Sequence, residues 1–332
     1  MNDLTQYLKS EIKDFLFTEL SDSFLAGSNL EFLSGIPVPI KQEDLKDFTS
    51  GGLSTTKIAD NMAVVIGADS GFKYSEYYVR YLKKLFDEKL SLVFCTKAEE
   101  LLTNKLPRKA LCYLRAAVLV DPKGLQSMYC YANGCRIWYQ SLEGSDEIEL
   151  ITLLKSDAYA YFAAVTNNYP DFAPAWYFLA YAYLNAGSYK KARLAFKHYM
   201  ANSEGQPEDD VQEVKDRMEE LEDPVKIEEG RDLLLAGRTL EALTVLEPYA
   251  QSRFSNWWPL HFYLATAYEA LGHNAEAIEG YTKVLGLNPS NYDAMISLSE
   301  LYEKAGDEEK ARKYSEKAKL VLKNREDIPE EQ

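Results

Sequence analysis

Few side chains in this chain have the types and spacing that chemistry requires. His198, His261 and His273 are the three histidines, and none stands at a recognisable spacing from a nucleophile. Cys130 and Cys135 are five residues apart on a predicted helix, so their side chains diverge around its axis and suit zinc poorly. We therefore predict no catalytic site, no metal site and no cofactor, and a protein that is not an enzyme.

The remaining candidate residues also lack the pattern of a chemical site. Cys95 and Cys112 fall on the two helices of one predicted hairpin, where we expect buried, inert thiols that pack near each other. The glycine-containing stretches GADSG (67–71) and SGG (50–52) match neither a phosphate-binding loop nor a dinucleotide fingerprint. Four cysteines in 332 residues are too few to indicate a disulfide framework.

Charge and hydropathy exclude two classes of partner. The chain has 52 acidic and 37 basic residues, a formal charge of −15 that repels a phosphate backbone, so we expect no nucleic-acid partner. Its most apolar stretch, APAWYFLAYAYLNAG (173–187), supplies roughly a dozen apolar residues, fewer than the ~20 that a membrane-spanning helix needs. Residues 1–20 contain no unbroken apolar run, so we predict no secretory signal and a cytoplasmic protein.

A repeat organises most of the chain. Tyr268 and Tyr302 are 34 residues apart, as are Gly272 and Gly306. The apolar stretch 173–187 opens a segment with the same internal spacing. A fixed period of this length indicates stacked supersecondary units, each of which buries its apolar face against its neighbours.

The residues on this period resemble the tetratricopeptide repeat (TPR) family. The best matches are Trp176, Leu179, Ala180, Tyr183, Ala192 and Phe196, then Leu264, Ala265, Tyr268, Ala277, Tyr281 and Pro289, then Leu298, Tyr302, Ala311 and Ala318. A weaker copy runs through Phe94, Ala98, Leu101, Ala110, Leu114, Ala117 and Pro122, with Lys97 where leucine is usual. The resemblance implies an all-α fold, an α-solenoid of antiparallel helix hairpins over about residues 91–325, preceded by an N-terminal helical region.

Glycine positions and uneven spacing predict where hairpins turn and where the array changes. Gly187, Gly237, Gly272 and Gly306 each stand where a first helix must end and turn. We predict an N-terminal non-TPR or degenerate-repeat domain over 1–90 and a TPR array with an expanded second unit over 91–222. Residues 207–222 should form an extra amphipathic helix in that array. A second array of three units with a C-terminal cap should follow over 223–325.

The first 90 residues carry no TPR glycines. Residues 5–20 and 21–33 look like two helices, the second capped by Ser21 or Asp22. The segment around Pro37 and Pro39 should be extended; it is either a surface linker or an internal ligand of the groove. Ser54 or Thr55 should cap a helix through KIADNMAVVIG, and residues 72–90 should form an amphipathic helix. Residues 53–84 have the length of a helix-turn-helix, although their second helix lacks a basic, amide-rich row.

The resemblance also implies where a ligand binds. In this family the first helices of successive units line the concave surface, and ligands are extended peptides or partner helices. Carried over by spacing, the groove residues are Tyr129, Asn133, Arg136, Tyr177, Tyr181, Asn185, Ile227, Arg231, Phe262 and Thr266. Asparagine and arginine can hold a peptide backbone or a carboxylate, and tyrosine supplies rigid contact area. Cys95 replaces a lysine of the family's carboxylate clamp, so we do not predict chaperone docking.

Two functions follow from this pattern. The favoured prediction is a non-enzymatic adaptor or scaffold that binds a peptide or partner-protein segment in the concave groove. The alternative is a regulator whose repeats sense a peptide while its N-terminal domain acts on DNA or on an enzyme.

Overall fold

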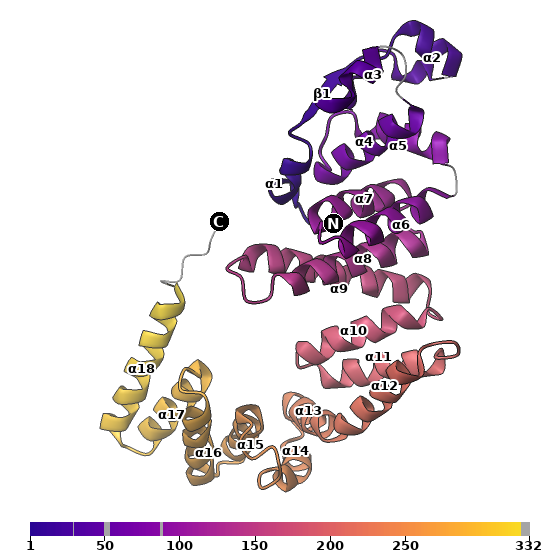
Figure 1. The fold of residues 1–332 in the computed structure, drawn as a ribbon. Helices are drawn as coiled ribbons and strands as arrows, with labels where there is room; N and C mark the ends of the chain where they lie inside the picture. The colour runs from indigo at the N-terminus through magenta and orange to yellow at the C-terminus, as the bar shows by residue number, and fades with distance from the viewer. Residues whose placement is uncertain (29, 50–53, 87–88, 327–332) are drawn as a thin grey trace. The chain divides into compact units, whose positions relative to one another are not determined.

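The protein is an all-α solenoid of helix hairpins, and its described residues include a small two-stranded antiparallel sheet near the start, as Figure 1 shows for the helices and strand β1 (Phe15–Thr18). The computed structural model describes residues 1–28, 30–49, 54–86 and 89–326. The described part confirms the predicted fold class. Among the described helices, none combines the length and apolarity that crossing a bilayer requires.

The chain divides into two compact units. One comprises Met1–Ala186 and Leu194–Pro207, and the other comprises Gly187–Arg193 and Glu208–Gln332. The N-terminal region therefore belongs to the same unit as the first helix hairpins.

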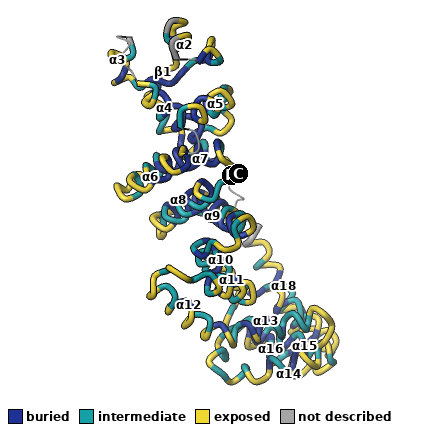
Figure 2. The backbone as a smooth tube through the Cα atoms, turned by 90° about the vertical axis from the view of Figure 1, so that its right-hand side faces the viewer, coloured by how far each residue is buried: buried dark blue, intermediate teal, exposed yellow. Residues whose placement is uncertain are grey.

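The first unit stacks its hairpins in chain order. Helices α6 (Leu90–Thr103) and α7 (Pro107–Val120) form one hairpin, and α8 (Leu125–Ser141) and α9 (Ile148–Asn168) form the next. Helix α10 (Ala173–Asn185) precedes α11 (Tyr189–Ala201), whose first residues, up to Arg193, belong to the second unit. Small side chains with no exposed surface, such as Ala98, Ala110 and Ala132, let these helices approach closely. Phe94 and Phe162 are buried in the same core, and Figure 2 shows buried residues in dark blue along α6 to α9.

The prediction of one helix over residues 5–20 is wrong. The segment divides into α1 (Thr5–Leu8), the 3-10 turn η1 (Lys9–Glu11) and strand β1 (Phe15–Thr18). Strand β1 pairs antiparallel with β2 (Val38–Lys41), and Phe15 lies opposite Lys41. Pairing with a strand more than twenty residues away overrides the local helical pattern, because strand preference depends on such neighbours.

The proline-rich segment is a buried strand, so neither a surface linker nor an internal ligand of the groove describes it. Val38 and Ile40 have no exposed surface. The carbonyl of Pro39 accepts a hydrogen bond from Asn61 Nδ2 at 3.1 Å, and that of Pro37 accepts one from the Tyr78 hydroxyl at 2.6 Å. The extended conformation predicted here is confirmed.

Several short elements complete the N-terminal region. They are α2 (Asp22–Ser28), η2 (Glu31–Leu33), η3 (Gln42–Asp44) and α3 (Leu45–Thr49). The predicted cap at Ser21 is confirmed, since its hydroxyl accepts from the amide of Phe24 at 3.3 Å. The second predicted helix ends at Ser28, however, and a 3-10 turn follows in place of its final turn. The SGG stretch at 50–52 lies outside the described residues.

Helices α4 (Thr55–Ala68) and α5 (Ser75–Phe86) join the N-terminal region to the array. Ser54 caps α4 as predicted, because its hydroxyl accepts from the amide of Lys57 at 3.3 Å. On α5, the guanidinium of Arg80 lies 4.4 Å from the centre of the Phe32 ring, and the Lys84 ammonium lies 5.9 Å from it.

A buried polar network holds residue Asn2 against the array. Its backbone amide donates to the Asp157 carboxylate at 2.9 and 3.0 Å, and its carbonyl accepts from Arg115 Nη1 at 3.0 Å. Arg115 has no exposed surface and also donates from Nε to the Gly67 carbonyl at 2.7 Å. Asp157 accepts a further hydrogen bond from Tyr131. These contacts tie α4, α7 and α9 to the start of the chain.

The second unit contains the remaining hairpins. Its helices are α12 (Glu208–Glu220), α13 (Glu222–Leu235), α14 (Thr239–Leu246), α15 (Trp258–Ala270), α16 (Asn274–Leu287), α17 (Tyr292–Lys304) and α18 (Glu308–Glu326), with the 3-10 turn η5 (Glu247–Tyr249) after α14. Helix α12 occupies most of residues 207–222, where an extra helix was predicted, but it belongs to the second unit and not to the first array. The four predicted turn glycines are confirmed, for example Gly187 at φ 66° and Gly306 at φ 78°. An added Cβ would meet no atom at either position, so the left-handed backbone is what favours glycine there.

Candidate functional site

A pocket of about 410 Å³ opens between the first helices of two adjacent hairpins, α6 and α8. Its lining is mostly apolar with a few amide and hydroxyl groups. The lining residues are Cys95, Ala98, Glu99, Leu102, Thr103, Leu114, Gln126, Tyr129, Cys130, Asn133, Ile137 and Phe172. Glu99 is the one residue of this set with a formal charge. An apolar cavity with a few convergent polar groups is the usual form of a binding site.

Tyr129 forms one wall of the pocket. Its ring contacts Phe172 edge-on at a centroid distance of 4.9 Å and lies 6.0 Å from Phe162. Burial raises the pKa of Tyr129 to about 12, so the phenol stays neutral and can donate a hydrogen bond at physiological pH. The side chain is half-buried, so it both supports the core and faces the pocket.

Asn133 and Arg136 are fixed in position by hydrogen bonds to each other. Arg136 donates to the Asn133 amide oxygen from Nε at 3.0 Å and from Nη2 at 2.8 Å. It also donates from Nη1 to Gln140 at 2.7 Å, and its guanidinium lies 4.4 Å from the centre of the Phe178 ring. The amide oxygen of Asn133 already accepts two hydrogen bonds from Arg136. A ligand would therefore contact Asn133 through its NH₂ group, which donates.

The predicted tyrosines on α10 extend this aromatic surface. Phe178 lies 6.5 Å from Tyr129 and 5.3 Å from Tyr177. Tyr177 lies 4.9 Å from Tyr181, which contacts Phe196 edge-on at 5.3 Å. The structure thus brings the predicted residues of α8 and two of those on α10 into one connected cluster.

The other predicted residue on α10 lies at the helix end. Asn185 is exposed and is the last residue of α10. Asn185 is not among the residues that line the pocket.

The predicted groove residues of the second unit have other environments. Ile227 has no exposed surface and belongs to the core around Leu246 and Leu264, so it offers no surface to a ligand. Phe262 contacts the Tyr281 ring at 5.6 Å. Thr266 donates from its hydroxyl to the Phe262 carbonyl at 2.9 Å.

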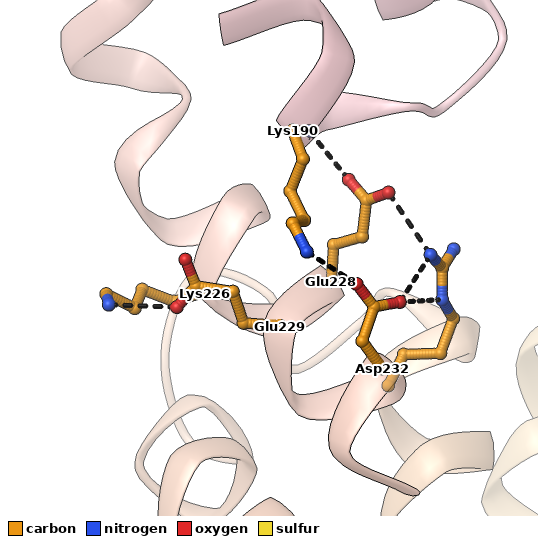
Figure 3. Close-up of polar contacts among 6 residues, drawn as sticks. Lys190, Lys226, Glu228, Glu229 and Asp232 are labelled. Atoms are coloured by element: carbon orange, nitrogen blue, oxygen red, sulfur yellow. Dashed lines mark hydrogen bonds and ion pairs between the residues drawn. The ribbon is translucent and has the colours of Figure 1, made fainter. Parts of the chain in front are cut away.

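Arg231 belongs to a polar cluster that anchors the start of α11, shown in Figure 3. Glu228 is buried and accepts from the backbone amide of Lys190 at 2.8 Å and from Arg231 Nη2 at 3.2 Å. Asp232 accepts from Lys190 Nζ at 2.6 Å and from Arg231 at 2.8 Å. Burial acts to raise the pKa of Asp232, but the hydrogen bonds from Lys190 and Arg231 outweigh it and lower the pKa below its ordinary value. This cluster stabilises a helix start in the second unit.

A larger pocket of about 620 Å³ lies in the N-terminal region and is balanced in charge. Its lining includes Lys41, Lys57, Lys97 and Lys109 together with Glu11, Asp14, Glu43 and Asp60. Lys57 pairs with Asp44 and Lys97 pairs with Asp60. Paired groups of both signs give no preference for an anion or a cation, so we do not assign a ligand to it.

Sequence reasoning missed several residues of the smaller pocket. Glu99, Leu102 and Ile137 line it, although spacing alone did not select them. The pattern of the sequence paired Cys95 with Cys112 and did not select Cys130. In the structure Cys95 lies beside Cys130, which belongs to the adjacent hairpin. All four thiols are free and buried. Within the described residues, no three histidine, cysteine or carboxylate side chains gather as a metal site would need.

Comparison with known families settles the kind of repeat. The tetratricopeptide repeat family model matches residues 155–207 and 262–320. These two segments are tetratricopeptide repeats. The matched residues include α10 and α11 in one segment and α16 and α17 in the other. Helices α6, α7 and α8 lie outside the matched residues.

No curated protein is similar enough to this chain to count as a match. Among solved structures, MamA protein is 14% identical over 72% of this chain and 96% of that chain, with a TM-score of 0.28. YrrB, a TPR protein with an unusual peptide-binding site, is 17% identical over 63% of this chain and 91% of that chain, with a TM-score of 0.29. The human IFIT1 dimer with PPP-AAAA is 15% identical over 80% of this chain and 55% of that chain, with a TM-score of 0.32. At these TM-scores the superpositions carry no functional argument.

Proposed function

We propose that this protein is a non-enzymatic cytoplasmic scaffold that binds an extended peptide segment of a partner protein. The proposed binding surface is the pocket between α6 and α8 together with the aromatic cluster that continues onto α10. The observation that carries the proposal is the pocket itself, about 410 Å³ in volume, with the pre-arranged pair Asn133 and Arg136 at its edge.

The pocket suits an apolar anchor side chain. Leu102, Ile137 and Phe172 line it, and a leucine- or phenylalanine-sized side chain fits its volume. Removing such a side chain from water contributes about 1.5–3 kcal/mol. The amides of Gln126 and Asn133 can hold the flanking peptide backbone, because each supplies NH₂ donors beside the apolar surface.

Charge favours a basic segment on either side of that anchor. Glu99 is exposed on the pocket wall, and the chain as a whole carries a formal charge of −15. A net negative field accelerates the approach of a cationic partner and disfavours an acidic one. Arg136 is not part of the pocket lining, whereas Glu99 is.

A displayed peptide library would test the proposal. We expect the full chain to select peptides with one large apolar residue flanked by lysine or arginine. Ile137→Asn should then weaken binding at least about tenfold, which corresponds to about 1.4 kcal/mol. Glu99→Lys should weaken basic peptides specifically, whereas Glu100→Lys, also exposed on α6 but outside the lining, should bind as wild type does.

Two results would contradict the proposal. One is a library screen in which none of the selected peptides binds the wild-type chain in solution. The other is an Ile137→Asn variant that keeps wild-type affinity while its helical content is unchanged. The alternative predicted from the sequence, a regulator with a DNA-acting N-terminal domain, stays a prediction that duplex binding at varied salt would test.

A further inference from the structure

Two cysteines from adjacent hairpins line the same pocket. Cys95 belongs to α6 and Cys130 to α8, and they are 35 positions apart, one more than the repeat period. Stacking of hairpins places equivalent positions of neighbouring first helices against each other. Both side chains are part of the pocket lining, and Cys130 keeps 8% of its surface exposed there.

Gln126 and the two thiols form a small hydrogen-bonded group. The Cys95 thiol has a single proton, which it can donate either to the Gln126 carbonyl at 3.6 Å or to the neighbouring Cys130 sulfur. Gln126 Nε2 donates to the Cys130 sulfur at 3.3 Å. The Cys130 sulfur thus has one amide donor, and it gains a second donor when the Cys95 proton turns toward it, an arrangement that suits a thiolate better than a thiol.

This environment separates the four thiols by reactivity. The hydrogen bond from Cys95 lowers the pKa of Cys130 although burial opposes it, and the same contact raises the pKa of Cys95. Burial raises the pKa of Cys112 and of Cys135, which have no exposed surface and lie outside the pocket. A nucleophilic thiolate is thus favoured at Cys130 and disfavoured at the other three.

We propose that Cys95 and Cys130 form a dithiol modification site in the pocket, where a small-molecule disulfide converts them into an intramolecular disulfide. The Cys130 thiolate attacks one sulfur of the disulfide RSSR, forms a mixed disulfide and releases RS⁻, which takes up a proton. The Cys95 thiol then loses its proton and attacks the Cys130 sulfur, which expels the second RS⁻. The two cysteines lose two electrons and two protons in total, and RSSR gains them as two RSH molecules.

The modification would also change the proposed peptide site, a consequence that rests on the proposed function. A disulfide holds two sulfurs about 2.05 Å apart, much closer than a thiol–thiol hydrogen bond does. Forming it draws α6 and α8 together across the pocket mouth. Oxidised protein should therefore bind the selected peptides more weakly than reduced protein.

The wild-type full chain provides the first test. The reduced protein is incubated with 2-hydroxyethyl disulfide, a small neutral probe that the Glu99 carboxylate does not repel, then alkylated, digested and mapped by mass spectrometry. We expect a crosslinked peptide pair that joins Cys95 to Cys130, with Cys112 and Cys135 recovered in alkylated form. Recovery of all four cysteines in alkylated form, or a crosslink between any other two, would overturn the proposal.

Single substitutions then separate the two steps. Cys95→Ser should accumulate a mixed disulfide on Cys130 because the resolving thiol is missing. Cys130→Ser should react at least about tenfold more slowly than wild type, and Cys112→Ser should react as wild type does. Equal rates for Cys95→Ser and Cys130→Ser would refute the assigned roles. This chemical readout is independent of peptide binding, so a failed peptide selection leaves the outcome of the thiol test intact.

Discussion

A methyl group added at Gly67 should disrupt the packing of α4 against α7. Its Cβ would stand 1.9 Å from the carbonyl oxygen of Cys112 and 2.5 Å from the carbonyl carbon. Both atoms belong to the backbone of a buried helix and cannot rotate away. Gly67 also accepts the 2.7 Å hydrogen bond from Arg115 Nε, so a displaced α4 would weaken a contact of a fully buried cation.

The size of the effect follows from three contributions. Overpacking a dense core costs about 1–3 kcal/mol. Weakening a hydrogen bond to a charged group costs about 1.5–3 kcal/mol. Alanine is favoured over glycine in a helix by about 1 kcal/mol, which offsets part of the loss. Gly67→Ala should therefore lower the free energy of unfolding of the first unit by about 1.5–5 kcal/mol.

Denaturant unfolding followed by circular dichroism and tryptophan fluorescence would measure this change. Gly286→Ala is the matched control, because Gly286 lies in α16 and an added Cβ would meet no atom within 4 Å. That variant should be as stable as wild type or up to about 1 kcal/mol more stable. A Gly67→Ala protein as stable as the Gly286→Ala protein would refute the close approach of α4 and α7.

Three further predictions follow from other contacts. Asp232→Asn should lower stability at neutral pH by at most about 1 kcal/mol, because its partners Lys190 and Arg231 are partly exposed. The lowered pKa of Asp232 means that this contribution is present above about pH 4 and is lost as the pH falls further, so thermal melts of the variant from pH 7 to pH 3 should fall less steeply than those of wild type. Phe162→Ala removes a side chain that is 1% exposed and supports Tyr129, and it should cost about 3–5 kcal/mol in a denaturant titration. Leu194→Ala removes a side chain that is 57% exposed and should change the free energy of unfolding by no more than about 0.5 kcal/mol.

Local chemistry made much of the fold predictable. The turn glycines, the cap at Ser54 and the extra helix before residue 222 depend on conformations and hydrogen bonds within a few residues. The register carried over from the TPR resemblance placed Tyr129, Asn133 and Arg136 on the first helix of a unit, because a fixed period returns each unit to the same orientation in the stack. These features need no knowledge of the rest of the chain.

Other features depended on which distant segments meet. Residues 15–18 have a helical pattern but form a strand, because residues 38–41 are available to pair with them. Ile227 has the spacing of a groove residue but is buried, since its neighbours in the core close over it. Such outcomes depend on contacts with side chains that are distant in the sequence.

The sequence by itself determined the repeat, its period and the positions at which hairpins turn. Only the tertiary structure decided that α6 and α8 leave a pocket between them and that Cys95 faces Cys130 within it. The physical reason is that periodicity specifies the direction in which a side chain leaves its own helix. The distance between two helices is instead set by the packing of all the side chains that separate them.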